Sequence, residues 1–283
     1  MKNLTKRTLS IIFAGLLVLG AAGCGGGDAK TEKKNAAAPA KKVLIGVRQD
    51  LVPTSYINEK GELTGYDIEI AKRIDELLPE YEFEYEAVSQ AALLTGLQSG
   101  KYKAASAGFY ENKERREKYL FPKENIGGNL IGITVRAEDA KELKSLEDVH
   151  DKGKKITPIA TTSGMYGVTV RYNQEHPDKK VEITPSDWND EATKYKYLDS
   201  KEYDAIVASL NLYNGYVDKT KTRDKYIFNP FTAIKTWSMF NKNEQALADA
   251  YDKALQQVKK EGFASKASVK WFGEDVFKYI DKK

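Results

Sequence analysis

Residues 65–80 read GYDIEIAKRIDELLPE, and their apolar residues recur at helical spacing. Five of these residues fall on one face of a helix: Ile70, Ala71, Ile74, Leu77 and Leu78. Asp67 is placed to cap the N-terminus, Glu69 in the first turn suits the helix dipole, and Pro79 ends the helix. The stretch therefore predicts an amphipathic helix that packs one face against a core.

Strand-like runs lie on both sides of this helix, with helical patterns between them. They cover residues 43–47, 81–88, 104–109, 130–135, 181–184, 204–209 and 237–240. A second clear helix, LADAYDKALQQVKKEG at 247–262, ends at Gly262. Alternating strands and helices predict an α/β architecture with largely parallel sheets.

Polar or small residues stand where several of the predicted strands end. Residues 43–283 are long enough for two α/β units of roughly 100 residues each. Ligands of such sheets bind beyond the carboxyl ends of the strands. Arg48, Phe109 and Ser209 stand at three such ends, so we expect a ligand site nearby.

The first 23 residues differ from the rest of the chain. Basic Lys2, Lys6 and Arg7 precede an apolar run, which small residues follow. This pattern predicts a signal peptide over residues 1–23, too short for a spanning helix. The next residue is Cys24, the only cysteine, so it is either a free thiol or a modified one.

LVLGAAGC, which ends at Cys24, resembles a bacterial lipobox, although Ala21 stands where such boxes often carry leucine. The resemblance implies cleavage before Cys24 and lipidation of that residue. It predicts an extracytoplasmic protein anchored to the bacterial cell membrane through Cys24.

Residues 24–42 are rich in Gly, Ala, Pro and Lys and predict a flexible tether. The whole chain has a formal charge of +4. The leader and tether carry that excess, because residues 43–283 hold 37 basic and 39 acidic residues. The folded part therefore has no basic footprint for nucleic acid.

Several motifs resemble the bacterial extracellular solute-binding proteins that serve polar amino-acid ABC importers. GYDIEIAKRI looks like that family's signature, and the other pieces follow in the family's order. They are GVRQDLVPTSY (46–56), LQSGKYKAASAGFYENKERREKYLF (97–121), KSLEDVHDKGKKI (144–156), YDAIVAS (203–209) and VKKEGFASKASVKWFGED (258–275).

The resemblance implies a type II periplasmic-binding fold, two α/β lobes joined by two hinge strands near 133–136 and 231–238. Residues 43–133 and 237–283 would form the first lobe, and residues 134–236 the second. The lobes would close on a small ligand. The resemblance also implies a monomer that delivers its ligand to a membrane permease and uses no cofactor or metal.

Arg115 falls on the arginine that clamps the ligand's α-carboxylate in the family. The residues agree, because ENKERREK predicts a short helix with Asn112 as its cap. A cation near a helix N-terminus opposes the dipole, so it needs an anion to hold, and a guanidinium suits a carboxylate. The alternative is a surface arginine, which fits Arg116 better.

Thr161, Thr162 and Ser163 align with a family motif that binds the ligand at the start of a second-lobe helix. Hydroxyls and free N–H groups there suit a carboxylate, although simple capping needs the same residue types. Gly108 and Tyr110 precede Arg115, and Tyr110 replaces the family's usual Ser or Thr in the cleft wall.

Two departures from the family bear on the ligand. Arg48 falls on a cleft position that is often acidic in binders of cationic amino acids. Ser209 replaces the aspartate that receives the ligand's ammonium, and Leu51 and Gln90 replace aromatic residues. Together they predict a compact anionic ligand, with an acidic amino acid favoured. Alternatively, Arg48 faces solvent and pairs with Asp50.

The sequence is also compatible with two other functions. A dehydratase-like enzyme on the same fold would act on an amine-free carboxylate, but no matched position supplies a tuned acid or base. A sensing module would report ligand occupancy to a partner receptor. We expect a binding protein that catalyses no reaction.

Overall fold

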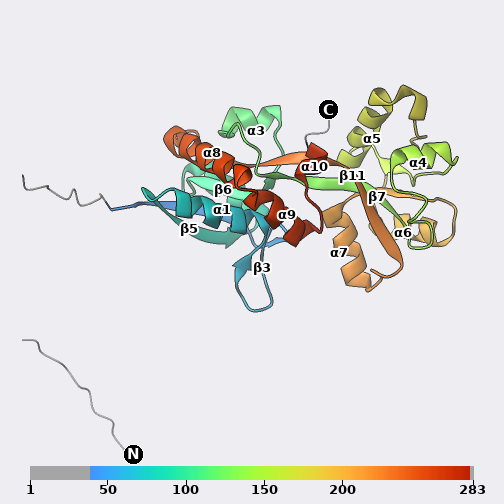
Figure 1. Cartoon of the computed structure of the whole chain (residues 1–283), viewed down its shortest axis with the longest axis horizontal. Coiled ribbons are helices and arrows are strands. Elements are labelled where there is room, and N and C mark those ends of the chain that lie inside the picture. The colour runs from blue at the N-terminus through green and yellow to red at the C-terminus, as the bar shows by residue number, and fades with distance from the viewer. Residues whose placement is uncertain (1–38, 281–283) are drawn as a thin grey trace, which may run out of the picture. The chain divides into compact units, whose positions relative to one another are not determined.

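The computed structural model of the chain describes residues 39–280 (Figure 1). The predicted signal peptide, Cys24 and most of the predicted tether lie outside the described residues.

The strands are β1 (Lys41–Arg48), β2 (Asp50–Leu51), β3 (Ser55–Ile57), β4 (Leu63–Thr64), β5 (Tyr81–Val88), β6 (Ala104–Phe109), β7 (Gly127–Arg136), β8 (Ile159–Ala160), β9 (Pro185–Ser186), β10 (Ile206–Ser209) and β11 (Tyr226–Phe240). The helices are α1 (Tyr66–Leu77), α2 (Gln90–Ser99), α3 (Lys113–Lys118), α4 (Leu146–Asp151), α5 (Gly164–Glu175), η1 (Pro177–Lys179), α6 (Glu191–Asp199), α7 (Leu210–Thr220), α8 (Gln245–Lys260), α9 (Phe263–Phe272) and α10 (Phe277–Ile280).

One sheet runs through two lobes in the strand order β10-β7-β11-β6-β1-β5. In the first lobe β1 pairs in parallel with both β5 and β6, which places their carboxyl ends at one edge. In the second lobe β7 pairs antiparallel with β10 and β11, so the prediction of largely parallel sheets is confirmed for β1, β5 and β6 and is wrong for β7, β10 and β11. Figure 1 shows α1, α8 and α9 in the first lobe and α4 to α7 in the second, with β7 and β11 between them.

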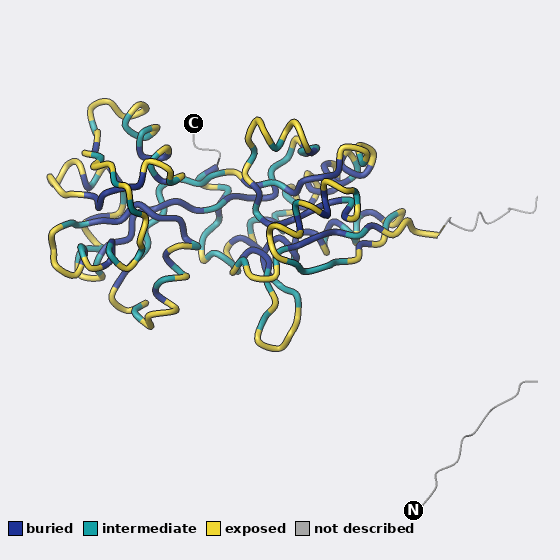
Figure 2. The backbone as a smooth tube through the Cα atoms, turned by 180° about the vertical axis from the view of Figure 1, so that it is seen from behind, coloured by how far each residue is buried: buried dark blue, intermediate teal, exposed yellow. Residues whose placement is uncertain are grey.

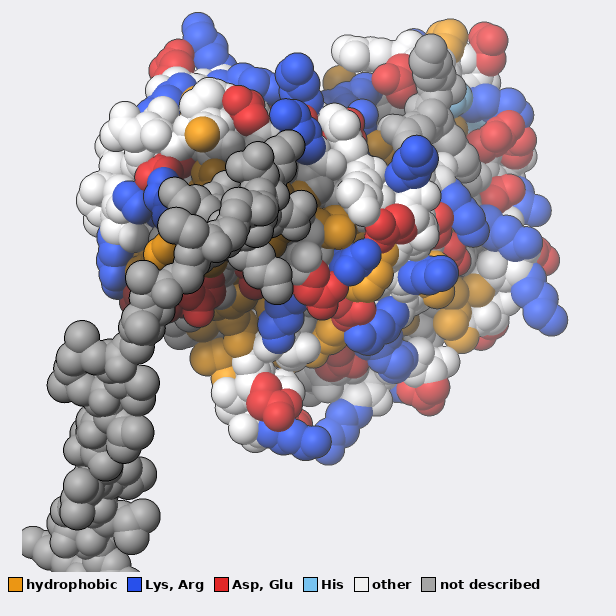
Figure 3. Space-filling model, turned by 60° about the vertical axis from the view of Figure 1, so that its left-hand side comes forward, with side chains coloured by type: hydrophobic (Ala, Val, Ile, Leu, Met, Phe, Trp, Pro, Cys, Tyr) orange, Lys and Arg blue, Asp and Glu red, His pale blue; other side chains and the backbone are white. Residues whose placement is uncertain are grey.

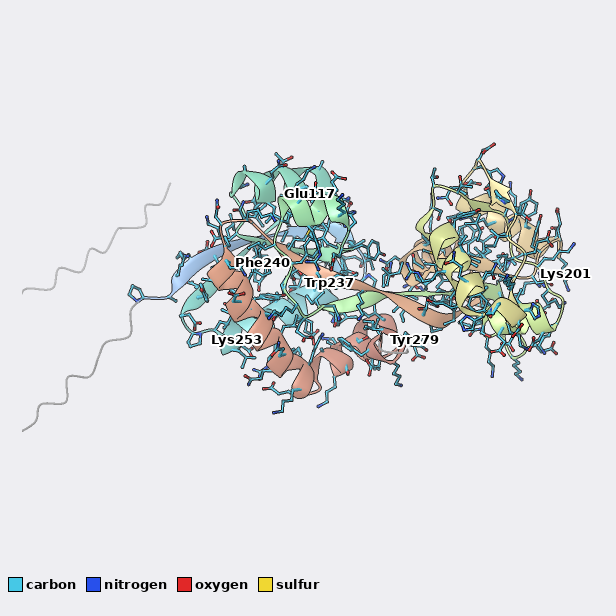
Figure 4. The ribbon with its side chains drawn as sticks, turned by 90° about the horizontal axis from the view of Figure 1, so that it is seen from above. Glu117, Lys201, Trp237, Phe240, Lys253 and Tyr279 are labelled. Atoms are coloured by element: carbon cyan, nitrogen blue, oxygen red, sulfur yellow. The ribbon has the colours of Figure 1, made fainter. Side chains whose placement is uncertain are left out.

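The strands β7 and β11 connect the two lobes. They pair from Tyr226 opposite Arg136 to Thr236 opposite Gly127, after which β11 pairs with β6. Figure 4 labels Trp237 and Phe240 on this last part of β11, and Lys201 in the second lobe. Both predicted hinge crossings therefore lie within long paired strands.

Each lobe has its own apolar core. In the first lobe, Ile70 and Ile74 of α1 are fully buried, as the spacing of that helix predicts. In the second lobe, Ile133 and Val135 of β7 are also fully buried. Figure 2 shows burial following the central strands, and Figure 3 shows acidic and basic side chains intermingled on the face in view.

Six of the predicted strands are present: 43–47 in β1, 81–88 as β5, 104–109 as β6, 130–135 in β7, 204–209 largely as β10 and 237–240 in β11. The strand predicted at 181–184 is wrong. The side-chain amide of Asn173 takes both backbone groups of Val181, at 2.8 and 2.9 Å, so a neighbouring strand cannot pair there. Pairing begins only at β9, beside β8.

The cap predicted for α1 is also wrong. Gly65, at φ 125°, is the N-cap, and Asp67 lies inside the first turn. A Cβ at Gly65 would lie 2.4 Å from the carbonyl oxygen of Thr54, so only glycine fits this turn. The Asp67 carboxylate is therefore free to reach β6.

Candidate ligand-binding site

A cavity of about 180 Å³ lies at the carboxyl ends of β1 and β6. Its wall includes six of the residues predicted for ligand binding: Arg48, Leu51, Gln90, Gly108, Tyr110 and Arg115. Strands β1 and β6 are adjacent and parallel, so residues distant in sequence converge at this edge of the sheet.

Arg115 is held in place by its own loop. Asn112 caps α3 by accepting a hydrogen bond from the Arg115 backbone N–H at 2.8 Å. The Arg115 guanidinium lies over the Phe109 ring at 5.4 Å, and its Nη1 donates to the Tyr110 carbonyl at 2.6 Å. Among the described residues no carboxylate comes within 4.0 Å of this guanidinium, whereas neighbouring Arg116 pairs with Glu111.

Arg48 lies at the end of β1 with its side chain 18% exposed. Its Nε donates to Asp50 at 2.7 Å, and its Nη1 donates to the Gln90 side chain at 2.6 Å. Arg48 thus pairs with Asp50, as one interpretation of the sequence expects, while its side chain is largely buried in the cavity wall. A guanidinium has five N–H donors, so three stay available after these two contacts.

Asp67 lines the same cavity, although its sequence context predicted only a helix cap. It is 1% exposed, and its Oδ2 accepts from Ser106 Oγ at 3.0 Å and from the Gly108 N–H at 2.9 Å. Its Oδ1 has no partner among the described residues. Burial raises the pKa of Asp67 to about 6, against the two hydrogen bonds, which favour the charged form.

Tyr110 joins the first lobe to the hinge strand β7. Its hydroxyl accepts a hydrogen bond from the Asn129 side-chain amide at 2.6 Å, and both residues line the cavity. Tyr110 thus forms part of the wall and also holds Arg115 through its carbonyl. Asn129 was not predicted, because a single asparagine just before the strand run at 130–135 has no distinctive pattern.

The four residues predicted in the second lobe do not line this cavity. Thr161 and Thr162 are exposed, and Ser163 caps α5 by accepting from the Met165 N–H at 3.2 Å. Ser209 is 5% exposed and caps α7 by accepting from the Leu212 N–H at 3.3 Å.

Comparison with known proteins identifies the family of this chain. Residues 43–274 match the bacterial extracellular solute-binding proteins, family 3. The chain belongs to this family. The fold is accordingly the type II periplasmic-binding fold that the sequence predicted, with two lobes joined by two strands.

Three relatives in this family are similar over most of their length. The chain is 31% identical to the L-cystine-binding protein TcyJ of Bacillus subtilis, covering 97% of this chain and 98% of that protein. It is 31% identical to TcyK of the same organism, also named L-cystine-binding, covering 95% and 96%. A solved structure, the probable amino-acid ABC transporter extracellular-binding protein ytmK of Bacillus subtilis, is 30% identical. It covers 83% of this chain and 99% of that one at a TM-score of 0.64.

The family membership establishes the class of function. This family-3 protein is an extracytoplasmic solute-binding protein of an ABC importer and not an enzyme. Its family binds small amino-acid ligands and works with membrane permeases. No helix within residues 39–280 is long and apolar enough to cross a membrane, and the same residues contain no cluster of metal-ligating side chains.

Proposed function

We propose that this binding protein captures an amino acid that carries two carboxylates. The observation that carries the proposal is that Arg115 and Arg48 line one cavity while Arg115 has no carboxylate of the protein within 4.0 Å, among residues 39–280. Arg115 would hold the α-carboxylate in a bidentate pair, and Arg48 would hold the second carboxylate with its remaining donors.

The charges around the cavity support an anionic ligand. Two arginines face one buried acid, Asp67, whose pKa is raised by burial to about 6. Asp50, which pairs with Arg48, has a 58% exposed side chain and so is well solvated. A ligand carboxylate would therefore find positive potential at both arginines.

Two kinds of ligand satisfy this requirement. L-Glutamate and L-aspartate carry a second carboxylate on a short side chain, and the sequence pattern at Arg48 and Ser209 favours them. L-Cystine carries an amino acid at each end, hence also two carboxylates. The two Bacillus subtilis relatives named L-cystine-binding favour L-cystine as the second candidate.

Lobe closure would complete the site. The hydroxyls of Thr161, Thr162 and Ser163 lie at the N-terminus of α5, outside the cavity. We propose that rotation about β7 and β11 brings this helix end to the ligand, between a first lobe of residues 43–133 and 237–283 and a second lobe of residues 134–236. Such closure requires one chain only, which is why we propose a monomer.

We further propose that the protein is held on the membrane by lipid attached to Cys24, after cleavage of residues 1–23. The lipobox-like LVLGAAGC supports this proposal. Metabolic labelling with palmitate should mark the wild-type protein and leave Cys24→Ala unlabelled. Equal labelling of both would refute an anchor at Cys24.

Isothermal titration calorimetry tests the ligand. The purified protein is partly unfolded and refolded to remove carried-over ligand, then titrated with L-glutamate, L-aspartate, L-cystine, L-glutamine, L-histidine and succinate. Binding of a dicarboxylic amino acid that weakens in Arg48→Ala supports the proposal. Tight binding of L-glutamine or L-histidine that is unaffected by Arg48→Ala refutes it. Binding of succinate alone would show that the ligand needs no amine.

A further inference from the structure

The second lobe contributes one helical residue to the cavity wall. Of the sixteen residues that line it, Asn211 alone comes from α4 to α7, and the others belong to first-lobe segments or to the connecting strands. Because a two-lobed binding protein must recognise its ligand from both sides, the chemistry of Asn211 decides what the second lobe recognises there.

Asn211 has a free side-chain amide. It lies in the first turn of α7, is half-buried, and makes no side-chain hydrogen bond within residues 39–280. Ser209, two residues earlier, uses its hydroxyl to cap the same helix and lies outside the cavity wall. The residue that faces the ligand space is thus Asn211, and not the residue that the family pattern indicates.

We infer that the Asn211 side-chain amide donates a hydrogen bond to a carboxylate of the ligand. This inference rests on the proposed function and specifies which group of the ligand the second lobe recognises. An amide can donate through Nδ2 or accept through Oδ1, so its surroundings decide between the two. The N-terminal end of α7 carries partial positive charge, and Arg48 and Arg115 line the same cavity, so a carboxylate is favoured over an ammonium group.

Ser209 is a neutral cap at the N-terminal end of α7. An aspartate at this cap would offset the positive end of the helix and so weaken the preference for a carboxylate. The chain instead has a neutral cap at Ser209 and a neutral amide at Asn211, which leaves the second lobe's contribution to this cavity without negative charge.

Two substitutions at Asn211 test the inference by the direction of their effects. Asn211→Ala removes the donor. We expect the wild-type protein's ligand among L-glutamate, L-aspartate and L-cystine to bind about tenfold more weakly or worse. Asn211→Asp places a negative charge against the ligand carboxylate, and we expect a larger loss. An acid in the first turn of α7 suits the helix dipole, so the melting temperature of Asn211→Asp should stay unchanged or rise.

Ser209→Ala is the matched control, because it alters the same helix end outside the cavity. Its affinity should match the wild type while its melting temperature falls. Unchanged affinity in Asn211→Ala would overturn the inference. Tighter binding in Asn211→Asp would also overturn it, because an acceptor for an ammonium group would then be at work. If the wild-type protein binds none of L-glutamate, L-aspartate and L-cystine, the proposed function itself fails.

Discussion

The two sides of the ligand site differ in how the sequence marked them. Every first-lobe residue that we predicted for binding lines one cavity: Arg48, Leu51, Gln90, Gly108, Tyr110 and Arg115. Every predicted second-lobe residue lies outside it: Thr161, Thr162, Ser163 and Ser209. Asn211, which we had not predicted, takes their place in the wall.

The difference has a physical cause. Arg115 was predicted because a cation near a helix N-terminus opposes the dipole, although α3 is only six residues long and Arg115 also belongs to its last turn. A hydroxyl at a helix N-terminus is already satisfied by capping, as Ser163 and Ser209 both show. A residue type that a helix end already requires for capping is therefore a weak marker of a ligand site.

The largest expected effect is on ligand affinity in Arg115→Ala. Removing the guanidinium leaves the ligand's α-carboxylate without its charged partner, so we expect a loss of about 100-fold, or roughly 3 kcal/mol. Calorimetry against the best ligand of the wild-type protein measures this loss. Arg116→Ala is the control, because Arg116 already pairs with Glu111, and its affinity should be unchanged. If both variants lost affinity to a similar degree, the loss would come from the change in surface charge and not from a specific contact of Arg115.

A second effect concerns stability and comes from Asp67, a buried residue of the cavity wall. The folded-state pKa of Asp67, about 6, is above its ordinary value of 3.8 because of burial. The folded state therefore binds the Asp67 proton more tightly than the unfolded state. This contribution to stability is fully present below about pH 4 and is lost as the pH rises through 6.

Asp67→Asn keeps this side chain neutral at every pH. The substitution therefore removes the pH dependence that Asp67 gives to the free energy of unfolding. Relative to the wild type, the variant should gain unfolding free energy between pH 4 and 7, by on the order of 2 kcal/mol. Urea unfolding at several pH values measures the difference. Ser209→Ala carries no titrating group, so its difference from the wild type should stay flat over the same range. A flat difference for Asp67→Asn as well would contradict the raised pKa.

A smaller effect on affinity is expected at Arg48. Its Nε and Nη1 are already engaged by Asp50 and Gln90, so only part of the guanidinium can serve the ligand. Arg48→Ala should weaken binding of a dicarboxylic amino acid about tenfold, or roughly 1.4 kcal/mol. Arg223→Ala is the matched control, because Arg223 also contacts one aspartate and one amide but lies outside the cavity wall.

Much of the fold follows from local pattern. The spacing of Ile70 and Ile74 predicts the buried face of α1, and the runs at 81–88 and 104–109 coincide with β5 and β6. The run at 181–184 fails because Asn173, a residue of another segment, occupies the backbone groups of Val181. Contacts of that kind depend on tertiary structure and leave no mark in a short window of sequence.

The site residues also divide into those that local sequence pattern marks and those that depend on tertiary contacts. Arg48 and Arg115 were predicted from their places at a strand end and in a short helix, and from their match to positions of the family pattern. Asp67 was visible only as a helix cap, since its contact with Gly108 joins α1 to β6 across the core. Asn211 is marked neither by charge nor by periodicity, and its place in the cavity depends on how α7 packs against the hinge.

The smallest expected effects are in the second lobe, and they separate capping from binding. Ser163→Ala and Ser209→Ala each remove an N-cap, so each should lower the free energy of unfolding by about 1 kcal/mol. If lobe closure brings α5 to the ligand, only Ser163→Ala should also weaken binding, by a few fold. Thermal unfolding and calorimetry on the same two variants provide both readouts. If both variants lose stability and neither loses affinity, α5 is merely capped, and the second lobe would meet the ligand through Asn211.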